Sequence, residues 1–97
     1  MNDMKKVLLK GIETYGEREQ SAVAMEECGE LIRAINKYHR KNSNENRKNL
    51  VEEIADVLTT IETLKIMYNL GEDEIKEWQK LKIFRFKQLL ASEGKNR

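Results

Sequence analysis

Apolar residues recur every three or four positions along most of the chain, which is the spacing of one face of an α-helix. The pattern predicts four helices, over about residues 3–15, 18–38, 47–70 and 73–92. Gly16 and Gly71 follow the first and third of these and are expected to end them, because glycine accepts a left-handed cap. Asp73 is expected to cap the last helix.

The two central helices are long and are separated by the polar tract HRKNSNENRK at residues 39–48, which predicts a solvated turn. A short turn makes them antiparallel neighbours. Their apolar stripes and that of the last helix are the expected core, namely Val23, Ala24, Leu31, Ala34, Ile35 and Tyr38, then Leu50, Ile54, Val57, Leu58, Ile61, Leu64 and Tyr68, then Ile75, Trp78, Leu81, Phe86 and Leu89.

The composition narrows the fold class. The 97 residues include no proline and five glycines, and 36% of them are charged, which favours an all-α chain. We expect a single domain over residues 1–97, with a short first helix up to residue 15 and a frayed tail at 93–97. A chain of this length buries only about 60 to 70% of its unfolded surface, so the core is thin and assembly with other copies is a natural remedy.

The formal net charge of +1 gives no global attraction to nucleic acid or to an anionic membrane. Any electrostatic function must therefore come from local clusters of charged residues.

The sequence also bears on the compartment. The first apolar run is too short and too interrupted by charge for a signal peptide or a membrane span. A single cysteine forms no internal disulfide and fits a reducing cytoplasm.

Carboxylates mark both long helices. At about 100° per residue, Glu27 falls inside the apolar arc of the first long helix, Glu30 at its border and Glu26 further round. On the second, Glu53 and Asp56 flank the apolar stripe, again three residues apart. Two antiparallel helices can thus aim four carboxylates at one place, which are Glu27, Glu30, Glu53 and Asp56.

Acidic pairs at this spacing are common on solvated helix faces, and either pair alone is better interpreted in that way. Two pairs that border the core are different, because desolvated carboxylates must protonate or hold a cation. The ligand set is all oxygen, which selects Mg²⁺ or Mn²⁺ over Zn²⁺. The lone His39 is expected at the surface, and Cys28 is expected to be a small helix-packing residue.

Magnesium usually binds substrate phosphates as well as protein carboxylates, so a phosphorylated substrate is expected. On the last predicted helix, Lys82 falls within the apolar arc and Arg85 borders it. Lys82 alone is equally explained as a lysine whose stem lies along apolar surface. Together, two bases facing four acids favour phosphate contact. Trp78 can stack on a base, although a core position is the simpler interpretation.

These residues resemble a known pattern. Glu26-Glu27-Cys28-Gly29-Glu30 reads as EExxE, Glu53-Ile54-Ala55-Asp56 as ExxD, and Lys82-Ile83-Phe84-Arg85 as a late KxxR. With Gln20 ahead of the first motif, the ordered combination over about residues 16 to 90 resembles the MazG-like branch of the all-α nucleoside triphosphate pyrophosphohydrolases.

The resemblance implies hydrolysis of a nucleoside triphosphate between its α and β phosphates, giving the monophosphate and pyrophosphate. It implies a helical bundle with a four-helix core completed in a homodimer or homotetramer. By the same resemblance, Glu27, Glu30, Glu53 and Asp56 ligate Mg²⁺ and Glu26 binds metal or orients water. Lys82 and Arg85 hold phosphate oxygens, and Gln20 contacts substrate.

Two alternatives stay open at this point. One is a phosphoribosyl-ATP pyrophosphohydrolase, which the same superfamily contains. A non-catalytic helical module is the other, with the basic tract at residues 39–48 binding nucleic acid. That tract is short, contains Glu45 and lacks interleaved aromatic residues, so a solvated connection explains it better.

Overall fold

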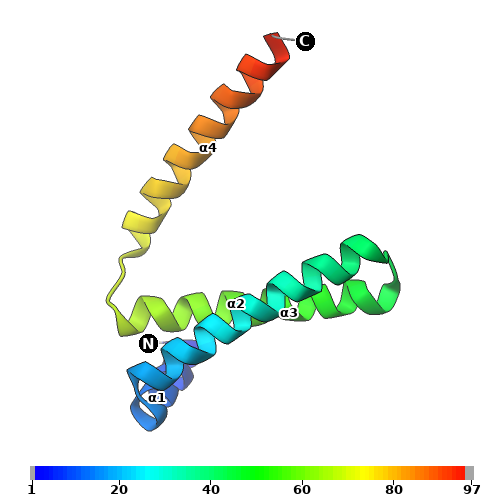
Figure 1. Ribbon diagram of the computed structural model, residues 1–97. Coiled ribbons are helices and arrows are strands. Elements are labelled where there is room, and N and C mark those ends of the chain that lie inside the picture. Colours follow the sequence, from blue (N-terminus) through cyan, green and yellow to red (C-terminus); the bar gives the residue numbers. More distant parts are fainter. Residues whose placement is uncertain (1, 96–97) are drawn as a thin grey trace.

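The computed structural model of the protein describes residues 2–95, apart from the side chain of Lys95. Four helices follow one another along the chain, α1 (Asp3–Tyr15), α2 (Glu17–Arg40), α3 (Asn44–Met67) and α4 (Glu72–Lys95) (Figure 1). No strand occurs within residues 2–95. The protein is therefore all-α, as the composition predicted.

Helices α2 and α3 form an antiparallel hairpin, and they make the most extensive helix–helix contact of the chain (Figure 1). The predicted polar loop at 39–48 was wrong in length, since only residues 41–43 lie outside the two helices. Polar side chains there close the turn. Ser43 Oγ accepts the Asn46 amide at 3.1 Å, and Asn46 Nδ2 donates to the Lys41 carbonyl at 3.0 Å.

The helix ends depend on two residues with positive φ. Gly16, between α1 and α2, has φ 88° as its predicted capping role requires. At the end of α3 this conformation belongs to Asn69, with φ 52°, and not to Gly71. The Leu70 amide donates to the Lys65 carbonyl at 3.0 Å and the Asn69 amide to Ile66 at 3.4 Å, which is a Schellman motif. Asp73, predicted as a cap, lies inside α4.

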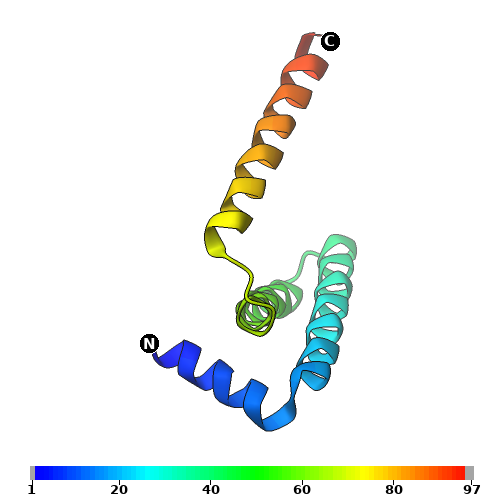
Figure 2. The same cartoon turned by 90° about the vertical axis from the view of Figure 1, so that its left-hand side faces the viewer.

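Small residues let α2 and α3 approach each other. The buried residues of the described chain are Ala24 and Ala34 on α2 and Thr60 and Thr63 on α3, and no large side chain in residues 2–95 is fully buried. Helix α1 packs against this hairpin and contacts both of its helices (Figure 2). Much of the predicted core thus stays exposed, with Ile35 51% and Leu58 59% accessible.

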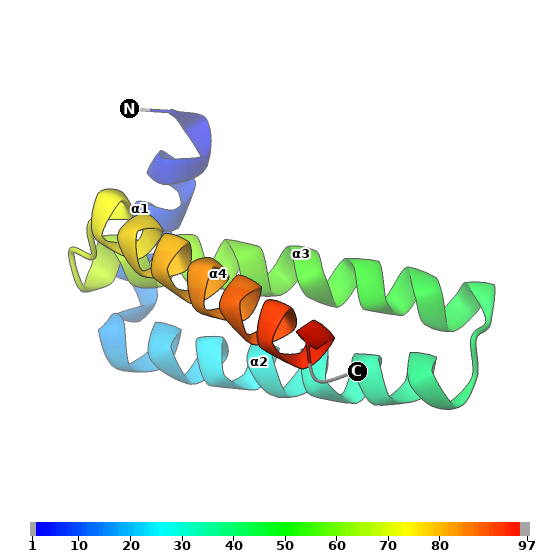
Figure 3. The ribbon, with the colours of Figure 1, turned by 90° about the horizontal axis from the view of Figure 1, so that it is seen from above.

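Helix α4 leaves the hairpin and projects away from it (Figures 1 and 2). In the view from above, α4 crosses over the hairpin only in projection (Figure 3). Between residues 72 and 94 only Ile75 is even half-buried, so the predicted burial of Trp78, Leu81, Phe86 and Leu89 is wrong for the single chain. Residues 93–95 are helical, and 96–97, the rest of the predicted frayed tail, lie outside the described residues.

None of the helices within the described part of the chain has a stretch long and apolar enough to cross a membrane.

Candidate metal centre

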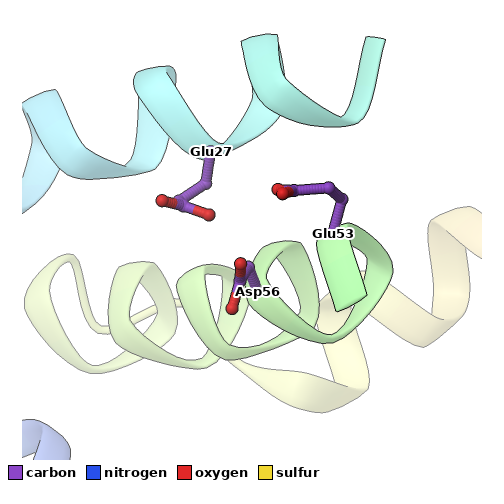
Figure 4. A group of neighbouring side chains, drawn as sticks. All are labelled: Glu27, Glu53 and Asp56. Atoms are coloured by element: carbon purple, nitrogen blue, oxygen red, sulfur yellow. The ribbon is translucent and has the colours of Figure 1, made fainter. Parts of the chain in front are cut away.

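Three carboxylates meet between α2 and α3. Glu27 points from α2 toward α3, while Glu53 and Asp56 point from α3 toward α2 (Figure 4). The three-residue spacing on α3 places its two acids one turn apart on the side that faces α2. One oxygen from each of the three side chains lies within 4.8 Å of the others. We call Glu27, Glu53 and Asp56 the carboxylate cluster.

The cluster is partly shielded from solvent. Glu27 and Glu53 are half-buried, whereas Asp56 is exposed, so the cluster is accessible from one side. Glu27 Oε2 and Glu53 Oε2 are each buried and have no hydrogen-bond partner. A desolvated carboxylate oxygen without a partner costs free energy, which a bound cation would offset.

Burial and mutual repulsion act on the same two glutamates. Burial raises the pKa of the Glu27 carboxyl above its ordinary value of 4.5, and the adjacent Asp56 raises it further. Burial also raises the pKa of Glu53, followed by the negative charges of Asp56 and Glu30. The positive charge of Arg33 acts in the opposite direction on Glu53. Like charges held in a partly dry site are therefore the dominant electrostatic feature.

The donor set fits a hard divalent cation. All three ligands are carboxylate oxygens, which suit Mg²⁺ and Mn²⁺. Around one Mg²⁺, neighbouring oxygens lie about 3 Å apart and opposite ones about 4.2 Å apart. One oxygen of each side chain lies within 4.8 Å of the others, so the three side chains would turn inward to share one ion.

The raised pKa values of Glu27 and Glu53 predict how the free energy of unfolding depends on pH when metal is removed by a chelator. Because the folded pKa values of Glu27 and Glu53 exceed 4.5, protonation favours the folded state. Stability should therefore rise as pH falls from neutral through the folded pKa values, with the gain complete near 4.5. Urea unfolding in EDTA at a series of pH values measures this, and Glu27→Gln should flatten the dependence.

The control for this pH experiment is Glu13→Gln, which changes an exposed carboxylate on α1. It should keep the wild-type pH dependence. Equal slopes for Glu27→Gln and wild type would contradict the electrostatic strain assigned to the cluster.

The fourth predicted ligand is not in the cluster. Glu30 forms an ion pair with Arg33, three residues further along α2, and its side chain is 41% exposed. Glu26 is exposed beside Glu27 and adds to the negative charge around it. The structure thus gathers three of the four predicted metal ligands and leaves Glu30 and Glu26 at the edge.

The predicted substrate-binding residues are more scattered. Gln20 is half-buried in the first turn of α2, about two turns before Glu27. Lys82 and Arg85 lie on the exposed helix α4, so within one chain they do not face the acids as the sequence pattern predicted. Lys82 Nζ instead lies 5.9 Å from the centre of the Trp78 ring.

Three further polar residues lie on the surface of α2, namely His39, Cys28 and Arg33. His39 is exposed, as predicted, whereas Cys28 is also exposed and is not packed between helices. It lines an apolar groove with Met25, Ile32 and Tyr68. Arg33 was missed by sequence reasoning, although its spacing of three from Glu30 on the same helix was an available signal for an ion pair.

Fold and site together define an all-α protein whose central hairpin holds a cluster of carboxylates suited to a divalent cation. Residues 16–77 match the family described as MazG nucleotide pyrophosphohydrolase domain. This is well over half of the chain, and the protein belongs to that family. The match includes the whole carboxylate cluster and ends before Lys82 and Arg85. No curated protein and no solved structure matched the chain.

Proposed function

We propose that this protein is a metal-dependent nucleotide pyrophosphohydrolase that cleaves a nucleoside triphosphate between its α and β phosphates. The observation that carries the proposal is the pair of buried, unpartnered oxygens of Glu27 and Glu53. They lie beside Asp56 within a chain segment that matches a pyrophosphohydrolase family. The cofactor is Mg²⁺, for which Mn²⁺ can substitute.

In the proposed mechanism Glu27, Glu53 and Asp56 would hold the metal, with Glu30 as a fourth carboxylate. When bound, Mg²⁺ neutralises the triphosphate and lowers the pKa of a water molecule for in-line attack on phosphorus. Glu26, exposed next to the cluster, orients that water or helps to bind the metal. A carboxylate accepts its proton. No covalent intermediate on the protein is needed.

The chain is also proposed to act as an oligomer. It exposes 8265 Å², whereas a compact folded monomer of 11.4 kDa exposes about 5,800 Å². Its radius of gyration is 17.4 Å against about 12.5 Å for a compact chain of this length. The excess is about 2,500 Å² per chain, or about 5,000 Å² for two chains, which is at the upper end of the total area that obligate dimers bury. A homodimer or homotetramer is therefore proposed.

Two exposed apolar surfaces support self-association. One is the hairpin apolar surface, formed by Met25, Ile32 and Ile35 of α2 and by Val51, Ile54, Leu58 and Ile61 of α3, each between 41% and 70% exposed. The other is on α4, where Trp78, Phe86 and Leu89 are more than half exposed. Packing of α4 against another copy would bring the positive charges of Lys82 and Arg85 toward that copy's carboxylate cluster, where they would hold phosphate oxygens.

We also propose that Gln20, half-buried in the first turn of α2, contacts the substrate.

We also place the protein in the cytoplasm, because its one cysteine is an exposed free thiol, which suits a reducing compartment.

The test of function is pyrophosphate release. Purified protein with Mg²⁺ or Mn²⁺ should release pyrophosphate from at least one member of a panel of ribonucleoside and deoxyribonucleoside triphosphates, with phosphoribosyl-ATP included. Metal that binds only the folded state should stabilise it by about 2.7 kcal/mol at a hundredfold excess over Kd. No release from any substrate, together with an unchanged melting temperature across a magnesium titration, would reject the proposal.

A further inference from the structure

Arg33 is a basic residue whose charge reaches the carboxylate cluster within one chain. Its guanidinium forms an ion pair with Glu30, and it opposes the effect of the surrounding acids on Glu53. The two bases that sequence reasoning assigned to the phosphates, Lys82 and Arg85, lie on α4, which projects away from the hairpin (Figure 1). Within a single chain, Arg33 is therefore better placed than Lys82 and Arg85 to act at this site.

Arg33 reaches the edge of the site through Glu30. It follows Glu27 by six residues, which is a rise of about 9 Å and a turn of about 120° round the helix, so its backbone position does not face α3. Long side chains on a helix lean back toward its N-terminus, which lets the guanidinium approach the edge of the cluster. Arg33 leans in this direction, because its partner is Glu30, one turn before it. Its side chain is 65% exposed, so the guanidinium is free to move at the edge of the cluster.

Electrostatics require a cation at this edge. The three carboxylates, with Glu30 beside them, bring up to four negative charges, which one Mg²⁺ only half neutralises. A triphosphate adds several more negative charges. Repulsion between the acids and the outer phosphates must be offset by protein cations, and a guanidinium can bind phosphate oxygens through two parallel hydrogen bonds.

We propose that Arg33 is a substrate-binding residue that holds the outer phosphates of the nucleotide, and that Glu30 releases it by turning from Arg33 to the metal. This inference rests on the proposed pyrophosphohydrolase function and adds to it a coupling between metal and substrate. Metal binding draws Glu30 inward, and the arginine that Glu30 held becomes available for phosphate. The ion pair thus keeps Arg33 at the edge of the site until metal binds.

The proposal predicts opposite effects on two ligands when Arg33 is changed to alanine. Calorimetry with Mn²⁺ alone should show binding about two- to fivefold tighter than wild type, since Glu30 no longer has to leave an exposed ion pair. In saturating Mg²⁺, inorganic pyrophosphate should bind about tenfold more weakly, because a charge-assisted contact is lost. The KM for the nucleotide should rise with it, and Arg33→Lys should restore part of the affinity.

Arg40→Ala provides the matched control, since Arg40 is an exposed arginine in the last turn of the same helix. It should leave both affinities at wild-type values. A merely structural role for Arg33 would alter melting temperature without moving the two affinities in opposite directions. Pyrophosphate affinity equal to wild type in Arg33→Ala would overturn the inference.

The same experiments distinguish a wrong role for Arg33 from a wrong function for the protein. A wild-type protein that releases pyrophosphate, with Arg33→Ala matching Arg40→Ala in both titrations, would overturn only the role of Arg33. A wild-type protein that binds no Mn²⁺ and hydrolyses no nucleotide would reject the proposed function, and the inference with it.

Discussion

Glu53→Gln should reduce pyrophosphate release by about a hundred- to a thousandfold. The substitution keeps the shape of a half-buried ligand but removes its charge, and metal-assisted stabilisation of a phosphoryl transition state contributes several kcal/mol, with each 1.36 kcal/mol worth a factor of ten. The same change removes repulsion from Asp56 and Glu30. We therefore expect the variant to melt at a higher temperature than wild type in EDTA while losing its thermal response to magnesium.

Glu45→Gln is the control for this experiment, because Glu45 is an exposed carboxylate in the first turn of the same helix. It should retain both activity and metal response. Steady-state pyrophosphate assays and thermal melts with and without Mg²⁺ measure both effects. A Glu53→Gln protein with wild-type turnover would remove Glu53 from the proposed metal site.

Leu58→Glu should separate the proposed oligomer into monomers. Leu58 is 59% exposed on the hairpin apolar surface, where packing of another copy would bury it. Loss of a buried leucine costs about 1.5 to 3 kcal/mol, and burial of an unpaired carboxylate costs several more. The dissociation constant should rise more than about a hundredfold, since each 1.4 kcal/mol is a factor of ten. Sedimentation velocity across a range of concentrations measures the change.

The matched variant is Thr14→Glu, which also adds one glutamate to an exposed helical position. It lies on α1, which contributes no residue to the hairpin apolar surface, so it should assemble as wild type does. Because the single chain buries so little, the Leu58→Glu monomer should also unfold at a lower temperature than wild type. A monomeric wild-type protein, or an unchanged assembly in Leu58→Glu, would contradict the proposed interface.

Much of the fold followed from periodicity alone. The spacing of apolar residues predicted the helix Asp3–Tyr15 and the antiparallel hairpin, because these features depend on local pattern and on a short connection. Helix ends were less predictable. Asn69 takes the left-handed position that Gly71 was expected to hold, since asparagine also tolerates that conformation and the sequence does not say which of two nearby candidates is used.

The carboxylate cluster could be predicted because it lies within one pair of helices. Glu27, Glu53 and Asp56 come together because helical spacing fixes their directions once the hairpin is antiparallel. The direction of α4 was not predictable in this way. An amphipathic stripe shows that a face needs a partner without saying which surface supplies it, so Lys82 and Arg85 were expected opposite acids that they do not approach within the chain.

The short connection from Tyr68 to Gly71 has a consequence for symmetry. After this connection α4 projects away from the hairpin, and the turn at Asn69 and an ion pair from Lys65 to Glu72 at 3.7 Å lie at the connection. Two copies in which each α4 packs on the other copy form a closed two-fold dimer. Copies in which each α4 packs on the next copy form an open chain. The direction in which this connection holds α4 would therefore help to decide between a closed dimer and an open chain of copies.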